Sequence, residues 1–202
     1  MKIGVDLDDV LGEFMPRMLA FHNEKYGTKF GNRDVGHVHA LFELISDTEE
    51  EAIAKMELFY KSDYFSDLPP VKGAKENLRK IKDAGHKLVC ITGRPSHLKD
   101  LTVGWIKEHF EDIIEEVHFA DSVVHAHGWS KGEMCKRLGI HHHIDDFLAF
   151  AQNCAENGIS VFLLDRPWNR NVELDINIKR VFSWDEISLD LIKLNRLERN
   201  YD

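Results

Sequence analysis

The chain has 202 residues, of which 43% are hydrophobic and 30% are charged, ordinary proportions for a globular protein. Its 26 basic and 35 acidic residues give a formal net charge of −9, which argues against binding of polymeric nucleic acid, because that binding needs a basic surface. The sequence has no signal-peptide pattern, no apolar run of membrane-spanning length and no CxxC pair among its three cysteines, so we expect a cytoplasmic protein without membrane contact.

An apolar strand pattern at residues 2–5 ends in three closely spaced carboxylates, Asp6, Asp8 and Asp9. Like charges this close repel one another, so a carboxylate cluster at a strand end favours a bound cation or a chemical task. Carboxylate oxygens suit Mg²⁺, and an aspartate can serve as a nucleophile. The alternative is a polar junction between strand and loop, because Asp is a common turn residue.

The next segment, residues 12–70, has helical spacing and no strand pattern. We predict helices at 14–26, 41–45 and 48–61, followed by a stiff linker that ends in two prolines. The segment is too long for one crossover helix, so we predict a small helical cap. The core domain would then consist of residues 1–11 and 71–202.

The rest of the chain alternates between short apolar runs, which are typical of strands, and segments with the helical spacing of apolar residues. Strands are predicted at 87–91, 117–120, 142–144, 160–164 and 179–182, and helices at 74–84, 98–110, 131–138 and 147–156. Nearly all-apolar strands alternating with helices predict an α/β fold with a doubly wound, parallel, Rossmann-like sheet. An amphipathic helix predicted at 189–202 would pack on the sheet or on a neighbouring subunit, so a homodimer is one expectation.

Polar residues follow four of the predicted strands. In chain order they are Asp6 and Asp8, then Thr92, Gly93 and Arg94, then Asp145 and Asp146, then Asp165 and Arg166. Ligands of open parallel sheets gather beyond the carboxyl ends of the strands, so we expect these residues to share one site.

The residue types in this predicted site are those of metal-assisted phosphoryl transfer. Asp6 would attack phosphorus and form an aspartyl-phosphate, and Asp8 would protonate the leaving oxygen and then activate water. The carboxylate of Asp6, the backbone carbonyl of Asp8 and the carboxylate of Asp146 would bind Mg²⁺. Asp145 would be the alternative ligand or an outer partner.

Other residues would hold the phosphate. The Thr92 hydroxyl and the Gly93 amide would bind its oxygens, and Lys131, which begins a predicted helix, would balance charge. Arg94 and Arg166 would each clamp phosphate or pair with nearby acids, and we favour Arg166 facing the site.

Each of these motifs also has a purely structural interpretation. The Asp145-Asp146 pair could cap a helix, the Thr92-to-Pro95 segment could be a turn, and Lys131 could be a surface lysine. His141, His142 and His143 alternate between faces of a strand, so core packing is a simpler interpretation than a transition-metal site. The joint occurrence of the acidic and phosphate-binding motifs in one chain order favours the phosphoryl-transfer hypothesis.

Those motifs resemble the four signatures of the haloacid dehalogenase-like (HAD) superfamily of phosphohydrolases. They are Asp6-Leu7-Asp8-Asp9-Val10, Thr92-Gly93-Arg94, Lys131 and Ile144-Asp145-Asp146. A closer resemblance is to the cytosolic type C 5′(3′)-deoxyribonucleotidases, and it is carried by Phe65-Ser66-Asp67-Leu68-Pro69-Pro70-Val71-Lys72-Gly73-Ala74 and Ile91-Thr92-Gly93-Arg94-Pro95. The run Leu164-Asp165-Arg166-Pro167-Trp168-Asn169 also resembles bacterial nucleotidase-like relatives.

This resemblance implies a Mg²⁺-dependent phosphomonoesterase that acts on a small phosphorylated substrate, a nucleoside monophosphate. The alternatives are a phosphatase of sugar phosphates or other metabolites, and a non-catalytic phosphate-binding protein on the same fold. Cap aromatics that could contact a base, or belong to the core instead, are Phe14, Phe42, Phe59, Tyr60 and Tyr64.

Overall fold

The computed structural model describes residues 1–36, 40–120 and 128–199. Within these residues, six parallel strands form one sheet in the order β3-β2-β1-β4-β5-β6. The strands are β1 (Lys2–Val5), β2 (Lys87–Thr92), β3 (Glu116–Phe119), β4 (His142–Asp145), β5 (Ser160–Leu164) and β6 (Ile178–Val181). The chain therefore winds outward from β1 in two directions, which confirms the doubly wound α/β sheet and places the change of direction between β1 and β4.

The central strands are buried on both faces. Val5 of β1 lies opposite Cys90 of β2 and Ile144 of β4, and all three side chains are 0% exposed. β-Branched and small apolar residues fit such a doubly covered position. This burial holds the carboxyl ends of β1, β2 and β4 at fixed places along one edge.

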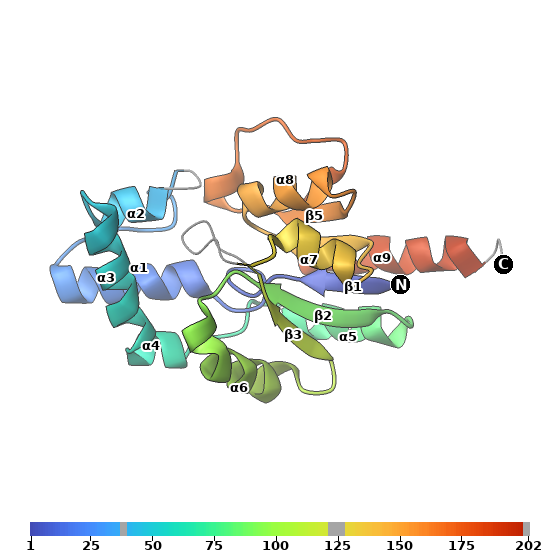
Figure 1. Ribbon diagram of the computed structural model, residues 1–202, viewed down its shortest axis with the longest axis horizontal. Helices are drawn as coiled ribbons and strands as arrows, with labels where there is room; N and C mark the ends of the chain where they lie inside the picture. The colour runs from blue at the N-terminus through green and yellow to red at the C-terminus, as the bar shows by residue number, and fades with distance from the viewer. Residues whose placement is uncertain (37–39, 121–127, 200–202) are drawn as a thin grey trace.

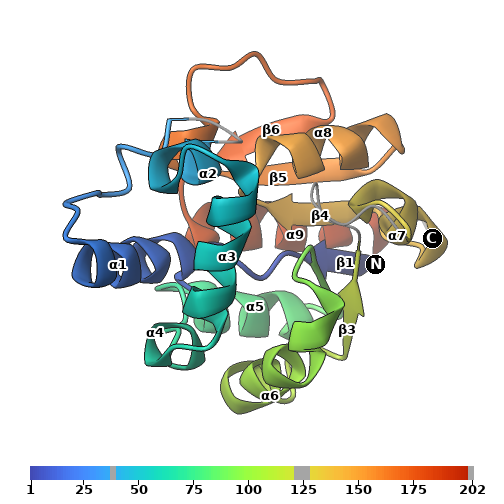
Figure 2. The same cartoon turned by 60° about the vertical axis from the view of Figure 1, so that its left-hand side comes forward.

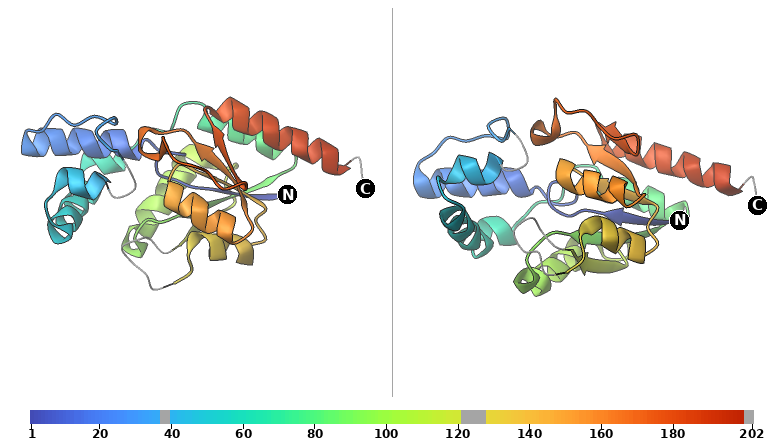
Figure 3. Two further views of the ribbon diagram at one scale, coloured as in Figure 1. Left: turned by 90° about the horizontal axis from the view of Figure 1, so that it is seen from above. Right: turned by 45° about the horizontal axis from the view of Figure 1, so that its top comes forward.

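In the part of the chain that the structure describes, five helices cover the two faces of the sheet. They are α5 (Ala74–Asp83), α6 (Lys99–Phe110), α7 (Lys131–Arg137), α8 (Leu148–Glu156) and α9 (Trp184–Arg199). Residues of α7 and α8 pack in one apolar cluster with β2 and β5, while residues of α5, α6 and α9 pack in another on the opposite face. Figure 3 shows α5 and α9 on one side of the sheet and α7 and α8 on the other. Short 3-10 turns occupy Ser96–Leu98 and Pro167–Asn169.

A second group of helices lies beyond the carboxyl ends of the strands (Figures 1 and 2). It consists of α1 (Phe14–Tyr26), α2 (Ala40–Ile45), α3 (Glu49–Tyr60) and α4 (Asp63–Ser66), all within the segment 12–70 that was predicted as a cap. Phe59 is fully buried at the centre of this group, with its ring 5.3 Å from Phe14 and 5.5 Å from Phe65. The exact division into core and cap stays a prediction.

Two neighbouring stretches of chain join the cap to the core. The Val71 amide donates to the Leu11 carbonyl at 2.7 Å, and the indole of Trp105 donates to the Leu68 carbonyl at 2.8 Å. The indole of Trp184 donates to the Val10 carbonyl at 3.2 Å. These bonds fix the loop that follows β1, where Asp6 and Asp8 lie.

The elements differ from the sequence prediction mainly near the chain end and in the cap. Helix α9 begins at Trp184, not at residue 189, because Trp184 is buried at 3% exposure and Ser183 accepts a hydrogen bond from the Glu186 amide. Helix α4 has four residues, too few to give a periodic pattern. None of the described helices is long and apolar enough to cross a membrane.

Candidate active site

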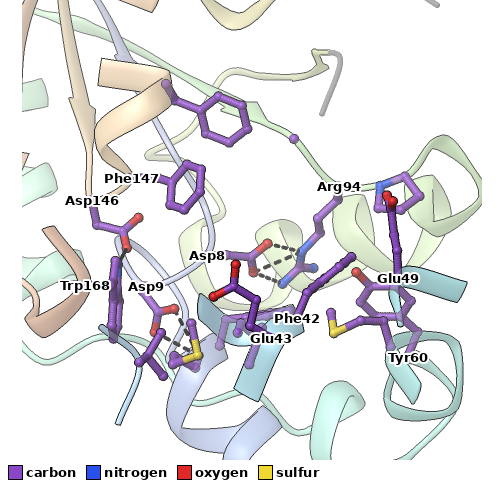
Figure 4. A pocket seen from close by; sticks show the side chains of 18 of the residues that line it. Asp8, Asp9, Phe42, Glu43, Glu49, Tyr60, Arg94, Asp146, Phe147 and Trp168 are labelled. Carbon is purple, nitrogen blue, oxygen red and sulfur yellow. Dashed lines mark hydrogen bonds and ion pairs between the residues drawn. The ribbon is translucent and has the colours of Figure 1, made fainter. Parts of the chain in front are cut away.

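A cavity of about 570 Å³ lies between the carboxyl edge of the sheet and the cap. Asp6 and Asp8 line it from the loop after β1, Gly93 and Arg94 from the end of β2, and Asp146 from the end of β4. Figure 4 shows Asp8 and Arg94 facing each other and Asp146 beside Trp168. The structure thus brings together three of the four predicted strand ends. At the fourth strand end, Asp165 does not join this group and instead forms ion pairs with Arg170 and Arg180.

Three buried carboxylates form the centre of this site. Asp6, Asp145 and Asp146 each offer one oxygen, and these oxygens lie within 4.8 Å of one another. Burial, together with the neighbouring carboxylates and against the opposing charge of Lys131, raises the pKa of Asp6 to about 6. Burial and the charges of Asp9, Asp145 and Asp6 raise the pKa of Asp146 well above its usual range. A divalent cation held by carboxylate oxygens would relieve this repulsion, so the residues fit a metal such as Mg²⁺.

Lys131 lies behind the carboxylates and is 1% exposed. Its Nζ donates to Asp6 Oδ1 at 2.7 Å and to Asp145 Oδ2 at 2.8 Å, and it lies 4.1 Å from the ring centroid of Phe150. Burial alone would lower the pKa of Lys131, but the charges of Asp145 and Asp6 outweigh it and raise that pKa. The surface-lysine alternative is therefore wrong, and the ammonium is part of the charge balance of the site.

The start of α7 explains how Lys131 is placed. Ser130 and Glu133 form a capping box, in which the Ser130 hydroxyl accepts from the Glu133 amide and the Glu133 carboxylate accepts from the Ser130 amide. The Gly132 amide donates to Asn153 Oδ1 at 2.8 Å, and a Cβ at position 132 would lie 2.4 Å from the Asn153 carbonyl oxygen. The cap and this close approach of α7 to α8 fix the first turn of the helix.

Asp8 is held by Arg94 in a two-pronged ion pair. Arg94 Nε lies 3.1 and 3.0 Å from the two Asp8 carboxylate oxygens, and Nη2 lies 2.6 Å from Oδ1. The guanidinium also donates to Thr102 Oγ1 at 3.3 Å and lies 4.6 Å from the ring centroid of Phe65 in α4. The structure therefore places Arg94 on Asp8, while its expected contact with phosphate stays a prediction.

The end of β2 supplies the residues predicted to bind phosphate. Thr92 is 1% exposed, and its hydroxyl accepts from the Arg94 amide at 3.2 Å, as in a strand-to-loop turn. Gly93, between them, lines the cavity. The turn and the predicted phosphate site are thus the same stretch of backbone.

Three polar contacts at the site were not expected from the sequence. Asp9 has a positive φ of 59° and accepts from the Met15 amide at 3.0 Å, beside the start of α1. Arg166 Nη2 donates to the Asp9 carbonyl at 2.6 Å, which keeps Arg166 next to the loop after β1. The Trp168 indole donates to Asp146 Oδ2 at 2.8 Å. The position of Asp9 in the acidic run could have indicated a turn there, because Asp tolerates a left-handed backbone better than most residues.

The cap side of the cavity is largely apolar and carries three acidic side chains. Its lining includes Leu41, Phe42, Met56 and Tyr60 together with Glu43, Asp47 and Glu49, and the core contributes Phe147 and Trp168. Arg94 is the single Lys or Arg among the described lining residues, and Asp8 already pairs with it. The cap thus offers contact area to an apolar or aromatic group and repels a second negative charge.

One family model and several curated relatives match nearly the whole chain. The family model described as "5' nucleotidase, deoxy (Pyrimidine), cytosolic type C protein" matches residues 1–197. The chain is 24% identical over 191 residues to "Putative nucleotidase OB0422" of Oceanobacillus iheyensis, covering 92% of this chain and 96% of that protein. It is 28% identical over 194 residues to "Putative nucleotidase YqfW" of Bacillus subtilis, covering 92% of this chain and 91% of that protein.

A solved structure shares the fold. It is described as a HAD family hydrolase from Deinococcus radiodurans with bound phosphate and sodium, and it superposes with a TM-score of 0.67 at 15% sequence identity. The alignment covers 95% of this chain and 95% of that chain.

Proposed function

The chain belongs to the family of cytosolic type C 5′-nucleotidases within the HAD superfamily, and from this premise we propose that it hydrolyses (deoxy)nucleoside monophosphates with Mg²⁺, through an aspartyl-phosphate on Asp6. It is a phosphoric monoester hydrolase. The single observation that carries the proposal is the bond from Lys131 to Asp6, which orients a buried carboxylate that lines the cavity.

Two half-reactions would use the residues around the cavity. Asp6 attacks phosphorus, the bond from phosphorus to the ester oxygen breaks, and Asp8 gives its proton to that oxygen. Asp8, now a carboxylate, takes a proton from water, which attacks the aspartyl-phosphate and releases phosphate and Asp6. The ion pair with Arg94 suits the carboxylate form needed in the second half-reaction, so it must open when Asp8 carries a proton.

Asp6, Asp146 and the Asp8 carbonyl are the groups that would hold Mg²⁺. Asp145 is proposed as an outer partner, because its oxygens already accept from Lys131, His143 and the Phe147 amide. Asp146 accepts on Oδ2 from Trp168. When bound, Mg²⁺ supplies the positive charge that lets an anionic nucleophile approach an anionic phosphate.

The cavity supports a substrate whose leaving group is flat and uncharged. A nucleoside can lie against the apolar side chains of Phe42 and Tyr60, whereas a second phosphate would meet the acids Glu43, Asp47 and Glu49. Nucleoside monophosphates meet both conditions. Sugar bisphosphates and nucleoside diphosphates do not.

A panel of phosphate esters tests this proposal. Nucleoside monophosphates, sugar monophosphates, sugar bisphosphates and nucleoside diphosphates would be assayed for phosphate release with Mg²⁺ and with EDTA, using Asp6→Asn as the blank. We expect kcat/KM to be highest for nucleoside monophosphates and activity to disappear with EDTA. A preference for sugar phosphates would contradict the substrate assignment, and phosphate binding without any turnover would support the non-catalytic alternative. The cytoplasmic location and the homodimer stay predictions.

A further inference from the structure

A buried histidine lies beneath the site, on the strand that leads into its acidic pair. His143 is the second residue of β4 and is 0% exposed. Its Nε2 lies 3.0 Å from Asp145 Oδ2. The sequence pattern was interpreted as core packing. The contact with Asp145 now connects His143 to the carboxylates of the site.

The Asp145 carboxylate is the point at which His143 meets Lys131. Oδ2 accepts from both His143 Nε2 and Lys131 Nζ, and Oδ1 accepts from the Phe147 amide at 2.9 Å. Lys131 then donates to Asp6 Oδ1 at 2.7 Å. A continuous hydrogen-bonded chain therefore runs from His143 through Asp145 and Lys131 to Asp6. Three donors fix Asp145 in one orientation, and that orientation determines where Lys131 can lie.

Gly4 makes room for the imidazole. It lies directly opposite His143 in the β1–β4 register, and a Cβ at position 4 would lie 2.6 Å from His143 Nδ1. Real Cβ atoms do not approach so closely, so any larger residue at position 4 would displace the ring. A glycine inside a strand weakens it, and close approach of another group is a physical reason to keep one there.

The surroundings also determine which ring nitrogen carries the hydrogen. His143 Nδ1 has no hydrogen-bond partner among the residues that the structure describes, whereas Nε2 faces a carboxylate oxygen. A neutral imidazole therefore places its hydrogen on Nε2.

We propose that His143, seated in the space left by Gly4, is a positioning residue for the phosphatase reaction: by donating Nε2–H to Asp145 it holds Lys131 on Asp6. Its kinetic effect rests on the proposed function. The hydrogen bond itself is a property of the folded protein and can be measured without turnover.

Substitutions at position 143 distinguish the effect of the N–H donor from the effect of the imidazole ring as a whole. His143→Gln keeps an N–H near the place of Nε2, His143→Leu removes it, and His142→Gln is the matched control because His142 points to the other face of β4, near Phe162. We expect His143→Leu to lower kcat by roughly 10–100-fold with little change in KM, since partners of site ligands have effects of that size. His143→Gln should recover most of kcat, and the control should match the wild type. Wild-type kcat in a folded His143→Leu protein would overturn the proposal.

Gly4→Ala tests the same contact from the opposite strand. It should lower kcat like His143→Leu, but cost little more when it is added to His143→Ala, because the small side chain leaves space for the new methyl group. Fully additive losses in kcat for the two substitutions would contradict the proposed position of the His143 ring beside Gly4. Thermal unfolding of each variant would establish that the fold is retained.

A spectroscopic measurement makes the test independent of activity. In ¹⁵N–¹H spectra of the wild type, we expect a histidine Nε2–H that exchanges slowly with water and disappears in His143→Leu. A hydrogen on Nδ1 of His143 with none on Nε2 would overturn the proposal. If the wild type hydrolyses no phosphate ester while this signal is present, the proposed function fails and the hydrogen bond stands.

Discussion

The two sides of the cavity differ in how firmly their side chains are held. On the core side, Asp6, Asp146 and Lys131 are each at most 5% exposed and hydrogen-bonded to other side chains. On the cap side, Phe42 is half-buried and Glu43 is exposed. In the proposed function, strand ends buried in a parallel sheet carry the chemistry, while the cap helices carry recognition. Changes to the core side should therefore act on kcat, and changes to the cap side on the choice of substrate.

The largest effect is expected at the nucleophile. Asp6→Asn retains the shape of the side chain but not its nucleophilic oxygen, so kcat for any phosphate ester should fall by about 10⁴-fold or more. Phosphate release under saturating substrate measures the change, and circular dichroism checks the fold. Near-normal hydrolysis by this variant would falsify the nucleophile assignment.

The next effect is expected at the proposed acid and base. Asp8→Asn cannot transfer a proton and should lower kcat by roughly 10²–10⁴-fold, while inhibition by inorganic phosphate changes little. The loss should be smaller for an ester with an acidic alcohol, such as a nitrophenyl phosphate, because that leaving group needs less help from a proton. Equal losses for all esters would argue against a role for Asp8 in protonating the leaving oxygen.

A cap substitution should alter recognition alone. Phe42→Ala removes an apolar cavity wall and should lower kcat/KM for nucleotides by roughly 10-fold, through KM, while small alkyl phosphates are hydrolysed as before. Leu58→Ala is the control, because Leu58 is on the cap helix α3, is 43% exposed and is not among the residues that line the cavity. The same loss on nucleotides and on alkyl phosphates would mean that the cap does not contact the base.

The smallest effect concerns stability without metal. The pKa of Asp6 rises from 3.8 to about 6 in the folded protein. Ionisation of Asp6 therefore lowers the free energy of unfolding, by the full amount above pH 6 and not at all below pH 3.8. Asp6→Asn should therefore raise the melting temperature of the metal-free protein by roughly 2–6 °C near neutral pH. This gain should vanish in acid, and Mg²⁺ should stabilise the wild type more than the variant. A lower melting temperature for Asp6→Asn at neutral pH would contradict this account.

The sequence predicted the parallel sheet, and such a sheet brings the polar strand ends together for a physical reason. Strand ends in a parallel sheet share one edge, so Asp6, Thr92 and Asp146 could be brought together from strand patterns alone. Lys131 was predicted to balance charge because it begins a helix, where a cation opposes the helix dipole, although in isolation it could also have been a surface lysine. The metal ligands and the roles of these residues stay proposals.

Contacts that depend on three-dimensional packing were out of reach. The choice of Asp8 as the acid that pairs with Arg94, the bond from Trp168 to Asp146 and the contact of His143 with Asp145 depend on side-chain directions that no periodicity encodes. His143 in particular has the pattern of a buried core residue.

Trapping the covalent intermediate tests the central claim most directly. Wild-type protein mixed with a ³²P-labelled nucleoside monophosphate and Mg²⁺ would be quenched in acid and reduced with borohydride, which converts an acylated aspartate to homoserine. Mass spectrometry would then locate the modified residue. We predict protein-bound label during turnover and reduction at Asp6, with neither in Asp6→Asn. Modification at another residue, or rapid turnover without any bound label, would contradict phosphoryl capture by Asp6.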